Sequence, residues 1–252
     1  MEGESHQQSS EETIALLKKQ IDELTREKQQ IISLVSHDIK APLNRVFALV
    51  QLIQMEGENL TEDQLDYLTK MHLVVADGLG MIRNLVDYRN LEYRRIEIIP
   101  EEIDIVQVMK LVIRNFSTLA DMKKIELEVQ SPDSLMIQSD NHCILRSFEN
   151  LISNGLKFSN EGKKVFIKMQ RNDHGATISV QDEAGGFTQD DLKKMYGKFQ
   201  KLSALPTAGE STTGLGLLII KLMLKKVKGE IQCETTEGVG SVFTITLPRS
   251  IS

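Results

Sequence analysis

Two long apolar heptad repeats, separated by a short break, constrain the fold of this 252-residue chain more than any other feature. In the first repeat, apolar residues recur at alternating spacings of three and four, with one lysine as a polar interruption. Its positions are Ile14, Leu17, Ile21, Leu24, Lys28, Ile31 and Val35. This pattern is typical of a parallel coiled coil, and its charged flanks favour two chains over a helix packed on its own domain.

The first stripe continues to Ile53, and a second stripe follows. Gly57 and Asn59 interrupt the first, and Thr61 and Gln64 then have the spacing of a capping box that begins a new helix. The second stripe consists of Leu65, Leu68, His72, Val75, Leu79, Ile82 and Val86. Because one antiparallel hairpin cannot bury two complete stripes, we predict a homodimer in which two hairpins form a four-helix bundle.

After residue 95 the apolar period changes, which predicts a second domain of α+β class. The expected strands are 95–99, 124–130, 164–171, 176–181, 230–235 and 241–247, and the expected helices lie near 104–121, 140–157 and 214–228. Strands and helices do not alternate strictly, so we expect an α/β sandwich, a mostly antiparallel sheet with helices on one face. The predicted organisation is a disordered tail over 1–10, a coiled-coil helix over 11–35, a helical hairpin over 31–92 and this domain over 95–250.

Composition and charge exclude several classes of function. A formal net charge of −6 argues against non-specific nucleic-acid binding, and we expect no nucleic acid as a partner. Cys143 and Cys233 lack metal-ligand spacing and are expected to be reduced core residues. The sequence has no apolar run long enough to cross a bilayer and no signal peptide, so we expect no membrane contact and a cytoplasmic location. The chain begins at a coiled coil, so the cytosolic portion of a larger or membrane-bound receptor is the alternative.

The segment Ser-His-Asp-Ile-Lys-Ala-Pro-Leu at 36–43 carries a candidate nucleophile. At about 100° per residue, His37 lies roughly 160° around the helix from the apolar stripe at Ile39, so it should face solvent. Asp38 can hold one ring N–H of His37 and stabilise the cation that forms when the other nitrogen attacks. Pro42 should bend the helix nearby. Taken alone, a His-Asp dipeptide is more often a solvated polar pair.

Asn150, Asn154 and Lys157 share one face of a predicted helix. Amide oxygens are good ligands for magnesium, and a lysine can neutralise phosphate oxygens. The alternative is that these residues form only the wet side of a helix. Apolar residues between them indicate that the other side of this helix is packed.

Two glycine-containing segments complete the candidate chemistry. Asp182 ends an apolar strand beside Gly185 and Gly186, where a carboxylate can accept a hydrogen bond from an exocyclic amine. Residues 211–216 (Ser-Thr-Thr-Gly-Leu-Gly) open an apolar helix, whose exposed N–H groups suit phosphate. Either segment alone could be a plain turn.

In this order, the segments resemble the phospho-acceptor box of sensor histidine kinases and the N, G1 and G2 boxes of the GHKL ATPase superfamily. Residues 196–202 resemble its F box, and the aperiodic stretch 187–213 resembles its mobile lid. The resemblance covers residues 31–250. It implies a dimerisation and phosphotransfer hairpin over 31–92, an ATP-binding domain over 95–250, ATP and Mg²⁺ as cofactors, and the receiver domain of a response regulator as partner.

The resemblance also implies roles for single residues. ATP would phosphorylate His37 with Asp38 as base, and the phosphoryl group would pass to an aspartate of the regulator. Magnesium would be held by Asn154 and Asn150, phosphates by Lys157 and the adenine amine by Asp182. The other residues implied in nucleotide binding are Gly186, Phe199, Thr213, Gly214, Leu215 and Gly216.

Two positions depart from the family pattern. Ala184 stands where the G1 box usually has glycine, which leaves open whether ATP affinity is reduced. Ala41 lies one turn after His37, where the family usually has a threonine or asparagine that positions water. We therefore hypothesise weak phosphatase activity toward the response regulator.

Two other functions compete with the kinase. One is a GHKL ATPase of the chaperone, topoisomerase or mismatch-repair kind, against which the His37 box on a dimerising helix counts. The other is a non-catalytic scaffold that has lost nucleotide binding, against which the retained Asn154, Lys157 and Asp182 count.

Overall fold

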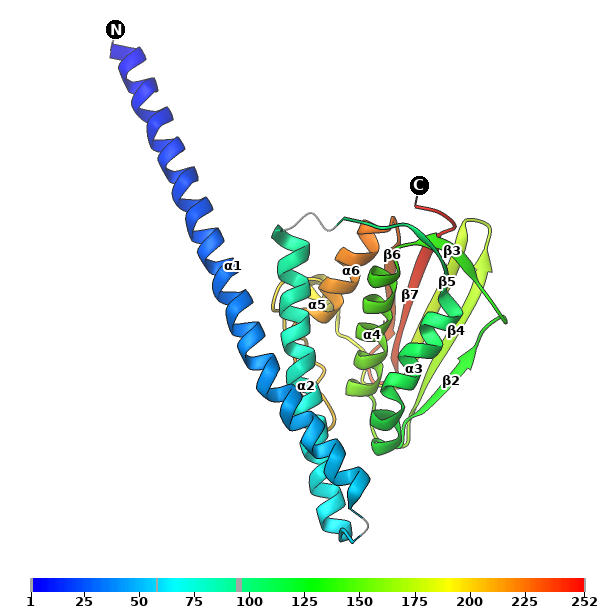
Figure 1. Cartoon of the computed structure of the whole chain (residues 1–252). Coiled ribbons are helices and arrows are strands. Elements are labelled where there is room, and N and C mark those ends of the chain that lie inside the picture. The colour runs from blue at the N-terminus through cyan, green and yellow to red at the C-terminus, as the bar shows by residue number, and fades with distance from the viewer. Residues whose placement is uncertain (1, 58, 94–96, 252) are drawn as a thin grey trace.

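The first heptad stripe forms one long helix, α1 (Glu2–Glu56), which packs against α2 (Glu62–Tyr93) as an antiparallel hairpin (Figure 1). The computed structural model describes residues 2–57, 59–93 and 97–251. The predicted capping box begins α2: the Gln64 amide donates to the Thr61 hydroxyl at 3.3 Å, and the Thr61 amide donates to Gln64 Oε1 at 2.9 Å. Among the described residues, every helix is too short or too polar to cross a membrane.

The amino-terminal segment differs from the prediction. The helix α1 begins at Glu2, whereas we expected a disordered tail over 1–10. This segment contains glutamate, glutamine and serine but no proline. Adding a residue to an existing helix costs much less free energy than nucleating a new one. The helix formed by the coiled-coil stripe can therefore extend toward the N-terminus through these polar residues.

The hairpin buries only part of its apolar surface within one chain. Val50, Leu68 and Val75 are buried between the helices, and the ring of Phe47 packs on His72 at 4.4 Å between centroids. By contrast, many stripe positions of α1 stay exposed: Ile14, Leu17, Ile21, Leu24, Ile31, Val35, Ile39, Val46 and Ile53. The homodimer stays a prediction, and these exposed residues are the surface it would bury.

The second domain is an α/β sandwich, as predicted. Its elements are β1 (Glu101–Asp104), α3 (Ile105–Met122), β2 (Glu126–Gln130), β3 (Met136–Ser139), α4 (Asn141–Phe158), β4 (Lys164–Asn172), β5 (Gly175–Asp182), α5 (Gln189–Lys194), α6 (Gly216–Lys226), β6 (Glu230–Thr236) and β7 (Gly240–Pro248). The five-stranded sheet has the order β2-β4-β5-β7-β6, with one parallel pair, β2–β4. The helices α3, α4 and α6 lie on one face of it (Figure 1).

The first strand and two short elements differ from the prediction. Residues 97–100 have no regular structure and 95–96 lie outside the described residues, so the predicted strand 95–99 is replaced by β1 at 101–104. Among the described residues this strand pairs with β3 alone, a four-residue strand that we did not predict. The helix α5 was also missed, because six residues are too few to display an apolar period.

The core fixes the orientation of α4. Its residues Phe148, Leu151 and Ile152 are fully buried in one cluster with residues of the sheet and α6. Because side chains three and four apart share a helix face, this packing turns Asn150, Asn154 and Lys157 to another side. Cys143 on the same helix is a free thiol, and burial raises its pKa to about 12.

Candidate functional site

His37 lies on the solvent side of α1, as helix phase predicted. Its imidazole is 84% exposed, and its Nδ1 lies 3.2 Å from Oδ1 of Asp38. In a neutral imidazole one nitrogen carries the proton and the other a lone pair. Since the carboxylate can only accept, the contact assigns the proton to Nδ1 and leaves the lone pair on the exposed Nε2. The helix continues through Pro42.

The asparagine face of α4 adjoins the start of α6. Asn150 donates from Nδ2 to the carbonyl of Arg146 at 2.9 Å, which fixes the orientation of its amide. A Cβ built on Gly216 would lie 3.6 Å from Oδ1 of Asn150 and 3.7 Å from both amide atoms of Asn154. The structure thus brings together residues that are separated by about sixty positions in the sequence, as the N and G2 boxes imply.

Asp182 is a buried carboxylate at the end of β5. Its Oδ1 accepts the amides of Ala184 at 3.0 Å and Ser241 at 3.2 Å. Burial raises the pKa of Asp182 above its ordinary value, and these two hydrogen bonds oppose that effect only in part. Among the described residues both bonds use Oδ1, so Oδ2 can accept from a ligand.

The G1 turn beside Asp182 tolerates alanine but requires one glycine. Gly186 has φ of 68°, and a Cβ there would lie 2.4 Å from the carbonyl of Thr236. In the described part of the chain, the non-glycine residues with positive φ are Lys124, Phe199 and Lys228. Ala184 is not among them, so its backbone gives no reason to expect a lower affinity.

The turn before α6 packs against the 196–202 segment. Gly214 has φ of 64°, and a Cβ there would lie 2.5 Å from the carbonyl of Gln200. The Thr213 hydroxyl accepts the amide of Leu215 at 3.3 Å. The side chain of Leu215 is buried in the core, so only its backbone can contact a nucleotide.

Phe199 contacts the hairpin. Its ring meets Tyr88 of α2 edge to face, at 5.9 Å between centroids, and its side chain remains exposed. Nucleotide contact by Phe199 therefore stays a prediction, and the contact with Tyr88 is one that the sequence did not indicate.

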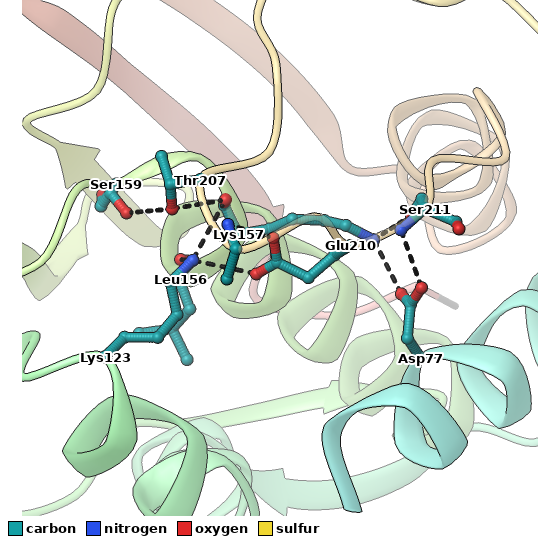
Figure 2. Close-up of polar contacts among 9 residues, drawn as sticks. Asp77, Lys123, Leu156, Lys157, Ser159, Thr207, Glu210 and Ser211 are labelled. Atoms are coloured by element: carbon teal, nitrogen blue, oxygen red, sulfur yellow. Dashed lines mark hydrogen bonds and ion pairs between the residues drawn. The ribbon is translucent and has the colours of Figure 1, made fainter. Parts of the chain in front are cut away.

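Lys157 is held by residues outside α4. Its ammonium donates to Oδ1 of Asp77 on α2 at 2.9 Å and to the carbonyl of Ser211 (Figure 2). The other oxygen of Asp77 accepts the Ser211 amide at 2.8 Å. Sequence reasoning missed Asp77, because its partner lies 80 residues away and no local pattern marks it.

A second ionic contact joins the hairpin to α4. Arg146 pairs with Asp87 at 2.6 Å and donates to Asn84 at 3.3 Å. Burial lowers the pKa of Arg146, but Asp87 and Glu149 outweigh that effect and raise it, so the guanidinium stays charged. Asp77, Asn84 and Asp87 are spaced by seven and three, so they form one polar face of α2 directed at the second domain.

Three features together define the class of this domain. They are a buried carboxylate at a strand end, two amides on one helix and a glycine turn that opens the next helix. Residues 139–251 match the family of histidine kinase-, DNA gyrase B- and HSP90-like ATPases. This part of the chain is a domain of that family, and the GHKL resemblance is confirmed.

The chain is similar to named sensor histidine kinases over nearly its whole length. It is 28% identical to the sensor protein EvgS of Escherichia coli K12 over 89% of the chain. It is 28% identical to the sensor histidine kinase GacS of Pseudomonas protegens over 92%, and 27% identical to WalK of Bacillus subtilis over 90%. It spans 19%, 26% and 38% of the length of these three relatives.

Solved structures share the fold. Full-length ShkA in complex with AMPPNP aligns with a TM-score of 0.64 at 23% identity, over 88% of this chain and 46% of that one. The histidine kinase AdeS of Acinetobacter baumannii aligns with a TM-score of 0.57 at 22% identity, over 84% of this chain and 98% of that one.

Proposed function

We propose that this chain is an ATP-dependent protein-histidine kinase of a two-component system. It phosphorylates His37 and passes the phosphoryl group to an aspartate in the receiver domain of a response regulator. The observation that carries this proposal is the exposed His37–Asp38 pair on a chain that also has the GHKL-type site. Similarity to named sensor histidine kinases supports it.

The nucleotide binds, in this proposal, between α4 and the start of α6. Oδ2 of Asp182 accepts the adenine amine, and the phosphates meet Lys157 and the N–H groups at Thr213–Gly216. Among the described residues no group of three or more His, Cys, Asp or Glu side chains could hold a metal ion. The amide oxygens of Asn150 and Asn154 fit magnesium, because they are hard oxygen ligands and phosphate and water can complete its shell. Bound magnesium supplies positive charge that stabilises the transferring phosphoryl group.

For the phosphoryl transfer itself, the protein mainly has to position the reacting groups and stabilise the charge that develops on them. Nε2 of His37 forms a bond to the γ-phosphorus while the bond to the bridging oxygen breaks, and ADP leaves with that electron pair. The ring becomes cationic, and Asp38 holds its Nδ1 proton and stabilises the charge. In the second step a regulator carboxylate attacks the phosphorus and neutral His37 is released.

One experiment separates this proposal from its competitors. The protein is incubated with γ-labelled ATP and magnesium, and protein-bound label is tested for loss in acid and retention in alkali. A kinase gives such a label on His37. Label-free protein that still hydrolyses ATP indicates an ATPase of the chaperone or topoisomerase kind. Protein that binds no ATP indicates a scaffold.

We propose that two copies associate through the hairpin and the coiled coil. Ile21→Asp and Leu24→Asp each place a charge on the exposed stripe of α1, so we expect each to shift the protein from dimer to monomer. Sedimentation at micromolar concentration measures the shift. The matched control is Glu23→Asp, which keeps the charge beside the stripe and should stay dimeric. Monomeric wild type would contradict the proposal.

We also propose weak phosphatase activity, because Ala41 has no group that can position water. Ala41→Thr restores a hydroxyl one turn from His37, and we expect dephosphorylation of the regulator to become about 10-fold faster. The decay of phosphorylated regulator, mixed with unlabelled kinase, measures it. Ala41→Val is the control, because it adds a similar volume without a hydroxyl. Equal decay rates for the threonine and valine variants would contradict the hypothesis.

A further inference from the structure

The contact between Asp77 and Lys157 joins the phosphotransfer hairpin to the proposed nucleotide site. Lys157 is the lysine that the GHKL resemblance assigns to phosphate, yet here its ammonium donates to Asp77 at 2.9 Å. Both side chains are mostly buried, at 15% and 20% exposure. Solvent and salt screen a partly buried ion pair less than a surface pair, so the attraction between Asp77 and Lys157 is stronger than that of an exposed pair.

The arrangement around Asp77 is that of an anion site. One carboxylate oxygen takes the ammonium of Lys157, and the other takes the backbone amide of Ser211 at 2.8 Å (Figure 2). A lysine and a backbone N–H are the donors that phosphate oxygens also select. The Asp77 carboxylate therefore occupies donors that a nucleotide phosphate would need.

Residues 207–210, near the end of the segment that resembles the lid, are held in place by contacts that do not involve Asp77. Lys123, with its ammonium buried, donates to Glu210 at 2.9 Å and to the carbonyl of Leu156 at 2.6 Å. The hydroxyl of Thr207 donates to the carbonyl of Ser159 at 2.8 Å. These contacts hold residues 207–210 at the end of α4. Loss of Asp77 would therefore remove the hydrogen bond to the Ser211 amide, while the Ser211 carbonyl still accepts from Lys157.

We propose that Asp77 is an internal anion that competes with the phosphates of ATP for Lys157 and for the Ser211 amide. This inference rests on the proposed function. In the nucleotide-free protein Asp77 holds the lid and α4 against the hairpin. Nucleotide phosphates displace it, which removes one of the contacts that hold the second domain against the hairpin, whereas the Arg146–Asp87 pair does not involve these donors. Coupling between two binding events is reciprocal. A change that weakens the contacts of Asp77 with Lys157 and Ser211 should therefore increase the affinity for ATP.

Asp77→Ala tests the competition in the full chain. We expect ATP to bind to this variant about 5- to 30-fold more tightly than to wild type, which lies in the lower part of the usual range of coupling between sites. Asp77→Asn keeps an oxygen for the Ser211 amide but loses the charge, so its affinity should fall between the two. The control is Asp66→Ala, which removes an exposed carboxylate from the same helix and should leave the affinity unchanged.

Hydrogen exchange of the Ser211 amide gives a second readout. In nucleotide-free protein it should be faster in Asp77→Ala than in wild type, because the hydrogen bond to the carboxylate is gone. Equal or weaker ATP binding by Asp77→Ala would overturn the competition while leaving the kinase proposal intact. Failure of wild type and all variants to bind ATP would overturn the kinase proposal and the competition with it.

Discussion

His37→Ala should abolish acid-labile labelling from γ-labelled ATP while leaving ATP binding unchanged. The imidazole provides the attacking nitrogen, so without it no bond to phosphorus can form. It is 84% exposed on α1, and in the described part of the chain its polar contact is with Asp38, so nucleotide affinity should not depend on it. Labelling by filter assay and binding of a fluorescent ATP analogue measure the two effects.

Two further variants sharpen this test. His142→Ala removes another exposed histidine from a helix and should keep full labelling. Asp38→Asn keeps the shape of its side chain but loses the charge that stabilises the imidazolium, so we expect labelling about 100-fold slower. Persistent labelling of His37→Ala would place the phosphoryl group on a different residue.

Asn154→Ala should lower the rate of His37 phosphorylation by about 100- to 1000-fold, the typical effect of removing one group that stabilises the charge of a transition state. Its amide lies beside Gly216 and Asn150, where the phosphates and magnesium are proposed to meet. Initial rates of labelling at saturating ATP measure the loss.

The magnesium dependence distinguishes a ligand from a merely structural residue. If Asn154 holds the ion, the magnesium concentration for half-maximal rate should rise in Asn154→Ala, and added magnesium should restore part of the activity. Asn160→Ala removes an exposed amide just beyond α4 and should behave as wild type. An unchanged magnesium requirement in Asn154→Ala would contradict the assignment.

Features with a local physical cause could be predicted from the sequence. The heptad stripes specify the hairpin, and the spacing of Thr61 and Gln64 specifies the start of α2. Helix phase placed His37 in solvent, and the i, i+4, i+7 spacing placed Asn150 and Asn154 on one face. These predictions succeeded because neighbouring residues determine them.

Features that depend on long-range packing could not be predicted. The strands β1 and β3 exist because they pair with each other, and each has only four residues. Asp77 lies on a helix whose pattern indicates only an exposed polar face, and its partner appears once the second domain folds against it. The helical segment over 2–10 was missed because polar composition does not distinguish a tail from an extended helix.

The most direct test of histidine kinase activity is to identify the nitrogen that carries the phosphoryl group. The Asp38 carboxylate lies 3.2 Å from Nδ1, so attack must come from Nε2. Nuclear magnetic resonance of ¹⁵N-histidine-labelled protein, incubated with magnesium and ATP and kept alkaline, resolves the two isomers. We predict phosphorylation at Nε2 of His37. Phosphate on Nδ1, on another residue or on no residue would contradict this mechanism.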